Sequence, residues 1–222
     1  LVMQQRNDPI TKIIIKSRTT AAFFVLILTL GLLSCAPQPP SIILCSQDEW
    51  RTGDLMLRCG CGAESRVVTA QSKSAYSHIG ILYYEPVQAE WMVIHAVPGE
   101  EEPEYIKMEP VAQYFHPVRA QEGAWLRVNC SDSIAYYAAQ YAKSKYDQKI
   151  VFDNSYLLAD SNQLYCTELV WRAYNTQSID ISGGNRHSVP DLFCKENECI
   201  FPNDIEKSET TLFVKPFKTK TL

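Results

Sequence analysis

The stretch "SHIGILYYEPVQAEWMVIHAVP" (77–98) contains two runs of β-branched and aromatic residues around a short polar segment. This pattern is typical of an antiparallel β-hairpin. If "EPVQAE" (85–90) forms the loop, Tyr84 pairs with Trp91. His78 and His95 then become diagonal neighbours on one face, with their backbones about 7–8 Å apart. A register shift of one residue would place the two imidazoles on opposite faces.

The two histidines admit two interpretations. Polar rings are poor core residues, so their place among the isoleucines of the hairpin favours a shared functional site. Alternatively, one face of the hairpin is exposed to solvent, where a histidine costs little free energy. The alternation along the strands does not separate these interpretations.

A second stretch, "QLYCTELVWRAY" (163–174), contains a candidate nucleophile. Its apolar positions follow the spacing of one buried helical face, which is formed by Cys166, Leu169, Val170, Ala173 and Tyr174. Cys166 lies in the first turn, where unpaired backbone N–H groups and the helix dipole favour a thiolate. The alternative is that Cys166 only packs in the core. As a nucleophile it would need a base and a third group that orients the base, and the hairpin offers His78 and His95.

The remaining pattern predicts an α+β fold, with a mostly antiparallel sheet of four to six strands flanked by helices. Further strands are expected at 53–59, 104–110, 123–129 and 210–218, and helices at 63–75, 131–145 and 187–193. Ser131 is positioned to cap the second of these helices. The apolar stripe expected on that helix comprises Ile134, Tyr137, Ala138, Tyr141 and Ala142.

The N-terminal 35 residues have the pattern of an export signal. A basic lead precedes the apolar run "AAFFVLILTLGLL" (21–33), which is short for a membrane span. The run ends in "LLSC" (32–35), which resembles a bacterial lipobox and implies cleavage before Cys35 and lipidation of that cysteine. The alternative is an uncleaved membrane anchor. Both interpretations place the protein in the bacterial cell envelope, outside the cytoplasm. Residues 36–49 are predicted to be a linker and 50–222 a single domain.

Composition excludes one class of partner. The chain of 222 residues has 21 basic and 25 acidic residues, and removal of 1–35 leaves 17 and 24, a net charge of −7. This balance does not suit nucleic acid.

An exported chain can form disulfides, but the sequence does not fix the pairing of Cys45, Cys59, Cys61, Cys130, Cys194 and Cys199. A local Cys194–Cys199 bond is preferred, because a short polar loop separates the two residues. The spacing of "CGC" (59–61) matches no ordinary zinc site, so no metal or cofactor is predicted.

Four segments in this order resemble one protein family: "GDLML" (53–57), "SAYSHIGIL" (74–82), "VIHAVPG" (93–99) and "LYCTELVWRAY" (164–174). They are similar to circularly permuted NlpC-type, papain-like cysteine hydrolases of the YiiX/YebB-like branch. The resemblance implies that Cys166 attacks a carbonyl carbon, while His78 forms an ion pair with the thiolate and later protonates the leaving amine. His95 takes the third position, where close relatives often have glutamate.

Other residues receive secondary roles. The backbone N–H of Cys166 is a natural oxyanion donor, because it lies at a helix start. Ser77 and Tyr165 flank the catalytic pair in sequence and are expected to line the substrate pocket. Asp54 belongs to the family pattern but suits a structural turn, and Glu168 suits the helix dipole. The acidic run "GEEEPE" (99–104) suits either a solvated loop or an attractant for amine-bearing substrates.

Three functions follow. The first is an anchored hydrolase that cleaves an amide bond in a peptide or peptidoglycan stem through a thioester. The second is an acyltransferase or lipid hydrolase on the same fold. The third is a binding lipoprotein without catalysis, which the absence of glutamate at His95 keeps open.

Overall fold

The computed structural model describes residues 41–42, 46–99, 103–156, 158, 161–188 and 198–220. The predicted signal segment and Cys35 lie outside these residues. Within the described part of the chain, no helix is long and apolar enough to cross a membrane.

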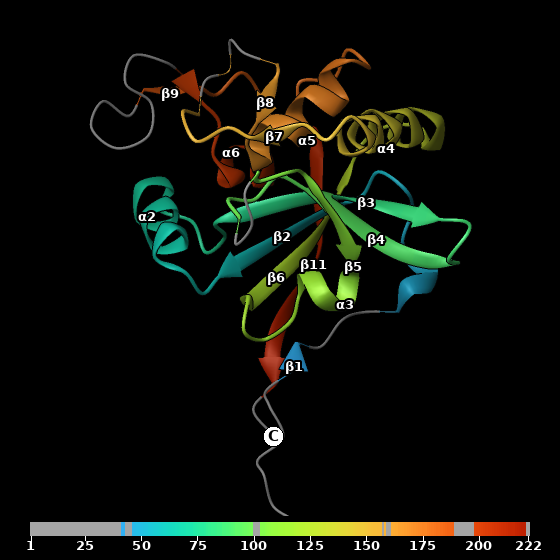
Figure 1. The fold of residues 1–222 in the computed structure, drawn as a ribbon, viewed down its shortest axis with the longest axis horizontal. Helices are drawn as coiled ribbons and strands as arrows, with labels where there is room; N and C mark the ends of the chain where they lie inside the picture. Colours follow the sequence, from blue (N-terminus) through green and yellow to red (C-terminus); the bar gives the residue numbers. More distant parts are fainter. Residues whose placement is uncertain are drawn as a thin grey trace, which may run out of the picture. The chain divides into compact units, whose positions relative to one another are not determined.

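The main sheet has seven antiparallel strands in the order β1-β11-β6-β2-β3-β4-β5 (Figure 1). Its strands are β1 (Ser41–Ile42), β2 (Leu55–Gly60), β3 (His78–Glu85), β4 (Glu90–His95), β5 (Lys107–Pro110), β6 (Ala120–Val128) and β11 (Thr211–Lys220). Six of them are longer than two residues, in agreement with the predicted α+β fold. β1 pairs with the end of β11, so the linker predicted for 36–49 is not entirely outside the fold.

The helices are η1 (Gln47–Glu49), α2 (Ala63–Ser72), α3 (Val111–Tyr114), α4 (Asp132–Asp147), α5 (Cys166–Asn175) and α6 (Pro202–Glu206). Two small sheets pair β7 (Val151–Phe152) with β8 (Gln163–Leu164), and β9 (His187–Ser188) with β10 (Glu198–Cys199). The prediction of a helix at 187–193 is wrong for its first two residues, because His187 and Ser188 form a strand that pairs with β10. The rest of that segment lies outside the described residues.

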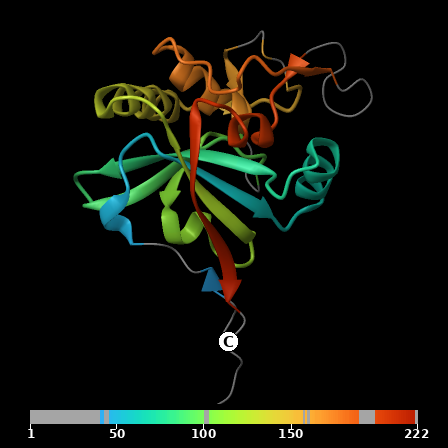
Figure 2. The ribbon, with the colours of Figure 1, turned by 180° about the vertical axis from the view of Figure 1, so that it is seen from behind.

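Side chains on the two faces of the sheet form separate hydrophobic clusters. One face packs beneath α4 and α5 through residues such as Leu57, Ile79 and Ile81. The opposite face packs against α3 through Met56, Leu82 and other residues. Helices therefore cover both faces, and Figures 1 and 2 show α4 and α5 on the opposite side of the sheet from α3.

The buried face of α4 differs from the predicted stripe. Ser131 caps the helix as predicted, by accepting a hydrogen bond from the backbone N–H of Ile134. However, Tyr137 is 58% exposed, and the buried residues are Ala135, Ala138, Ala139 and Ala142. The small alanine side chains allow close packing against α5, which leaves the larger tyrosine in solvent.

Disulfide pairing can be described only in part. Cys59, Cys61, Cys130 and Cys166 are free thiols. Cys45 and Cys194 lie outside the described residues, and so does the predicted Cys194–Cys199 bond.

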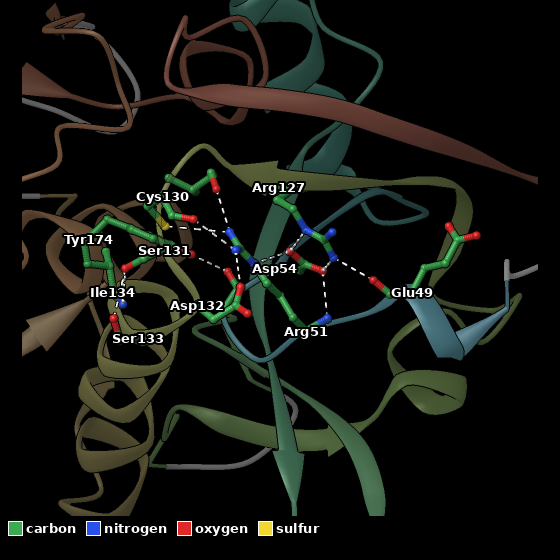
Figure 3. Close-up of polar contacts among 12 residues, drawn as sticks. Glu49, Arg51, Asp54, Arg127, Cys130, Ser131, Asp132, Ser133, Ile134 and Tyr174 are labelled. Carbon is green, nitrogen blue, oxygen red and sulfur yellow. Dashed lines mark hydrogen bonds and ion pairs between the residues drawn. The ribbon is translucent and has the colours of Figure 1, made fainter.

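Asp54 is the centre of a polar network that joins the start of β2 to β6 and α4 (Figure 3). Its buried carboxylate accepts hydrogen bonds from Arg127 Nε at 2.8 Å and Nη2 at 2.7 Å, and from the backbone N–H of Arg51 at 3.0 Å. Arg51 Nη1 also donates to Asp132 at 2.7 Å. Tyr174 donates to the carbonyl oxygen of Gly53 at 2.6 Å, which connects α5 to the same turn. These contacts give the "GD" pair a structural role.

We predict that Asp54→Asn lowers the free energy of unfolding by about 3 kcal/mol, because it breaks a buried ion pair and leaves Arg127 without its charged partner. Chemical denaturation of the two proteins measures the difference. Asp132→Asn is the matched control. The side chain of Asp132 is 90% exposed, so its loss should cost less than about 1 kcal/mol. Equal losses for the two variants would contradict the structural role of Asp54.

Candidate active site

One end of the sheet brings the predicted catalytic residues together. In the antiparallel order, β2 and β4 end where β3 and β5 begin. His78 is the first residue of β3, His95 is the last residue of β4, and Cys166 is the first residue of α5. All three line a cavity of about 320 Å³ at this end.

The hairpin has the register predicted from the sequence. Tyr84 pairs with Trp91 and Ile81 with Ile94, which places His78 and His95 on the same face. Their rings meet directly, because His78 Nε2 lies 2.8 Å from His95 Nδ1. The ring of Tyr114 packs against both, with centroid distances of 5.9 Å to His78 and 5.0 Å to His95.

A carboxylate extends this pair into a chain of three groups. His95 Nε2 lies 3.1 Å from Glu109 Oε1, and Arg119 Nη1 donates to Glu109 Oε2 at 2.8 Å. Burial tends to raise the pKa of Glu109. The hydrogen bond from His95 and the charges of Arg119 and Arg58 outweigh it and lower this pKa to about 2. Glu109 is therefore ionised at neutral pH and can only accept hydrogen bonds.

The ionised carboxylate fixes the tautomers of both histidines. Burial lowers the pKa of His95 to about 4, so its ring is neutral at pH 7 and has one N–H. That proton lies on Nε2, where Glu109 accepts it, and Nδ1 of His95 is therefore an acceptor. His78 must then donate through Nε2, which leaves the lone pair of a neutral His78 on Nδ1. This is the tautomer that a general base needs.

His78 is neutral for the same physical reason. Burial lowers its pKa well below the usual value, and the nearby charge of Arg58 acts in the same direction. Among the described residues, none hydrogen-bonds to Nδ1 of His78, so this atom is available to a thiol or a substrate.

The environment of Cys166 differs in one respect from the prediction. Burial raises the pKa of its thiol to about 11, although the backbone N–H groups of Ile79, Thr167 and Cys166 itself and the charge of Arg58 act to lower it. The backbone N–H groups at the helix start lower the pKa of the thiol, as predicted, but desolvation raises it by more. The resting state is a neutral thiol, rather than the thiolate and ion pair predicted from the sequence.

The sulfur lies close to the backbone next to His78. The N–H group of Ile79 that acts on Cys166 belongs to the peptide bond directly after His78. No hydrogen bond between Cys166 Sγ and His78 occurs among the described contacts, as a neutral resting pair allows. In ligand-free enzymes such bonds often form only when the substrate is bound.

The predicted pocket residues divide into two groups. Ser77 lines the cavity and also accepts a hydrogen bond from the backbone N–H of Gly60 at 3.0 Å. Tyr165 does not belong to the lining residues, so its predicted role is wrong. Its ring is buried in the core, and its hydroxyl accepts a hydrogen bond from the backbone N–H of Ile200 at 3.1 Å.

Two acidic predictions can also be placed. Glu168 lies in the first turn of α5, where Arg172 Nε donates to it at 2.7 Å. Burial raises the pKa of Glu168 to about 8, and the residue does not line the cavity. In the acidic run, Glu104 accepts hydrogen bonds from Gly99 and Asn154, which indicates a structural loop contact.

Sequence reasoning missed Glu109 and Arg58. Glu109 lies in the short "KMEP" strand (107–110), whose pairing with β4 depends on a connection that no short motif predicts. Arg58 lies in a strand already predicted, directly opposite His78. The alternation along "GDLMLRC" (53–59) places it on the same face as Met56, and this signal was available.

The chain matches the model of permuted papain-like amidase enzymes, the YaeF/YiiX, C92 family, over residues 49–215. It belongs to this family. The match covers all four segments that carry the resemblance seen in the sequence, and it includes Glu109 and Arg58. Membership assigns the chain to papain-like amidases. The roles of individual residues are argued from the geometry above.

The fold of this C92 member also resembles a solved structure. A crystal structure titled metalloprotein yiiX from Escherichia coli O157:H7 aligns with a TM-score of 0.61 and 20% sequence identity. The alignment covers 74% of this chain and 96% of that one. No curated protein matches the chain. Within the described ranges, no three histidine, cysteine or acidic side chains are grouped so that they could hold a metal ion.

We predict that Glu109→Ala removes the acceptor that fixes the His95 tautomer. In nitrogen-15 NMR spectra of the imidazoles, the native protein should show His95 protonated at Nε2, and Glu109→Ala should show a mixture of both tautomers. Glu109→Gln should largely restore the native pattern, because its amide oxygen can accept the same bond. Glu90→Gln, at the exposed opposite end of β4, is the control. An unchanged tautomer in Glu109→Ala would contradict the proposed chain.

The raised pKa of Cys166 predicts how its alkylation depends on pH. The rate of reaction with iodoacetamide, followed by mass spectrometry of the Cys166 peptide, should increase continuously from pH 6 to pH 10. The thiolate fraction grows with pH as long as the pH is below a pKa of about 11. A rate that levels off between pH 5 and 8 would instead reveal a resting thiolate–imidazolium pair.

Proposed function

We propose that this C92 amidase is an envelope lipoprotein that hydrolyses an amide bond in a peptide or a peptidoglycan stem through a thioester on Cys166. The observation that carries this proposal is the Glu109–His95–His78 hydrogen-bond chain. It leaves the basic lone pair of His78 on Nδ1, and His78 and Cys166 line the same cavity.

The first step is acylation. Because thiol and imidazole are both neutral at rest, His78 Nδ1 removes the thiol proton as the sulfur attacks the carbonyl carbon. The charge that develops on the carbonyl oxygen is stabilised by backbone N–H groups at the start of α5, including that of Cys166. His78 is then an imidazolium, held by its Nε2–H bond to His95 Nδ1.

The second step releases the amine and then the acid. The imidazolium donates its proton to the leaving nitrogen, the carbon–nitrogen bond breaks, and a thioester remains on Cys166. Water then enters, His78 removes one of its protons, and the thioester is hydrolysed. Glu109 and His95 remain in one protonation state throughout and act as positioning residues.

The proposal extends to the location of the enzyme. A lipid on Cys35 would hold the domain at a bacterial membrane, outside the cytoplasm. The predicted spacer after Cys35 leads to β1, which pairs with the C-terminal end of β11. In the main sheet β1 and β5 are the two edge strands, with five strands between them.

The geometry favours an enzyme over the non-catalytic alternative. A binding protein would not need a hydrogen-bonded histidine pair beside a free thiol, and both features are present. An acyltransferase or lipid hydrolase would use the same residues, so the experiment must identify the acyl group.

We predict that the full-length protein, incubated with peptidoglycan fragments and hydroxylamine, forms a hydroxamate of the acyl product. Hydroxylamine captures the thioester, so mass spectrometry of the hydroxamate identifies the bond that was attacked. Cys166→Ala should abolish the product, and His78→Ala should reduce it by at least about 100-fold. Lys215→Gln, on exposed β11, is the control.

Each other outcome has a distinct meaning. A fatty-acid hydroxamate from added phospholipid, with none from peptide fragments, would replace peptide cleavage with lipid hydrolysis. Hydroxamate formation by His78→Ala at the native rate would contradict proton removal by His78.

A further inference from the structure

The cavity beside Cys166 is basic, although the chain as a whole has a formal net charge of −4. Its charged lining residues are Arg58, Lys107, Arg119 and Glu64. Glu64, on α2, is exposed to solvent, where its charge is screened. The three cations are less exposed: Arg58 lies on β2, Lys107 on β5 and Arg119 directly before β6.

Arg58 is the most buried of these cations, with 6% of its surface exposed. Its guanidinium lies over the Tyr114 ring, 4.4 Å from the centroid, and Nη1 donates to the carbonyl oxygen of Tyr114 at 2.7 Å. Among the described residues no other group accepts a hydrogen bond from Arg58, and its buried Nε has no partner. A buried guanidinium with unused donors is costly unless a ligand supplies the acceptors.

The nearest carboxylate, Glu109, forms an ion pair with this cation but no hydrogen bond. Glu109 Oε1 is 3.9 Å from Arg58 Nη1, beyond hydrogen-bond distance. Both oxygens of Glu109 are already engaged, Oε1 by His95 and Oε2 by Arg119. One carboxylate therefore faces two guanidinium groups, and the cavity retains positive charge.

Lys107 adds a third cation on the other side of the histidines. It pairs with His95 across β4 and β5, just as Arg58 pairs with His78 across β2 and β3. Directly opposed residues share a face of the sheet, with Cβ atoms about 5 Å apart. No ion pair of Lys107 is present in the described part of the chain. Across the four adjacent strands the order is Arg58, His78, His95 and Lys107, with His78 and His95 diagonal to each other.

We propose that Arg58 and Lys107 form a subsite for a carboxylate that the substrate carries close to its scissile amide bond. This proposal rests on the amidase function proposed above and specifies its substrate class. A guanidinium with free donors and an ammonium group are the side chains that bind carboxylates. The histidines between them are neutral, so they neither add to nor offset this positive charge.

Two reagents of nearly equal size test the subsite without a known substrate. Iodoacetate and iodoacetamide alkylate a thiol by the same displacement of iodide, but only iodoacetate carries a carboxylate. The ratio of their rates at Cys166 is the measured quantity. Any change in the thiolate fraction cancels in this ratio, which matters because Arg58 also acts on the pKa of Cys166.

For the full-length protein in detergent, we expect the iodoacetate-to-iodoacetamide ratio at Cys166 to exceed that of glutathione by about tenfold, and to fall with added salt. Lys107→Gln and Arg58→Met should each lower the ratio several-fold. Lys107 is only partly buried, so its variant should fold even if Arg58→Met does not. Lys215→Gln removes an exposed cation outside the cavity and should leave the ratio unchanged.

A ratio equal to that of glutathione, with rapid reaction of iodoacetamide, would overturn the subsite but leave the amidase function intact. Failure of the native protein to form a hydroxamate from any peptide or lipid substrate, with the raised ratio still present, would instead overturn the proposed function.

Protection identifies the source of the anion. An N-acetyl amino acid should protect Cys166 from iodoacetamide, whereas its amide should not. Protection by glycerol phosphate alone would overturn the carboxylate assignment in favour of a phosphate group.

Discussion

The hydrogen bond between His78 Nε2 and His95 Nδ1 organises the chemistry of this protein. Each imidazole can donate through only one nitrogen when neutral, so the direction of this bond is set by the next group, Glu109. The ionised carboxylate directs one proton to His95 Nε2 and thereby the other to His78 Nε2. Three side chains on three adjacent strands thus leave the lone pair of His78 on Nδ1, and His78 lines the same cavity as Cys166. Close relatives often have glutamate in the third catalytic position. Here His95 takes that position, and a glutamate, Glu109, hydrogen-bonds to His95 instead.

Burial gives this site its preorganisation and also its resting state. Desolvation keeps both histidines neutral, and it raises the pKa of the Cys166 thiol more than the helix start lowers it. A neutral pair does not require a separation of charge in a partly desolvated cavity before the substrate arrives. In the proposed mechanism the proton moves when the carbonyl carbon is attacked, and the charge on the carbonyl oxygen develops at the backbone N–H groups of the start of α5.

The surrounding fold holds this arrangement from two sides. Tyr114 packs against both imidazoles, and its carbonyl oxygen accepts a hydrogen bond from Arg58. The short helix α3 therefore holds both His78 and Arg58 in position. At the other end of β2, the Asp54 network fixes the start of that strand relative to β6 and α4. The strands are thereby held in the register that aligns Arg58, His78 and His95.

Local patterns in the sequence predicted the hairpin, its register and the helix that begins at Cys166, because side-chain periodicity follows directly from strand and helix geometry. The pairing of Tyr84 with Trp91 was correct for this reason. Only the tertiary structure revealed Glu109, since a strand's neighbour in a sheet is a long-range relation that no local period encodes. The protonation state of Cys166 was also beyond the sequence. The helix start can be read from residue order, but desolvation depends on every element packed around the sulfur.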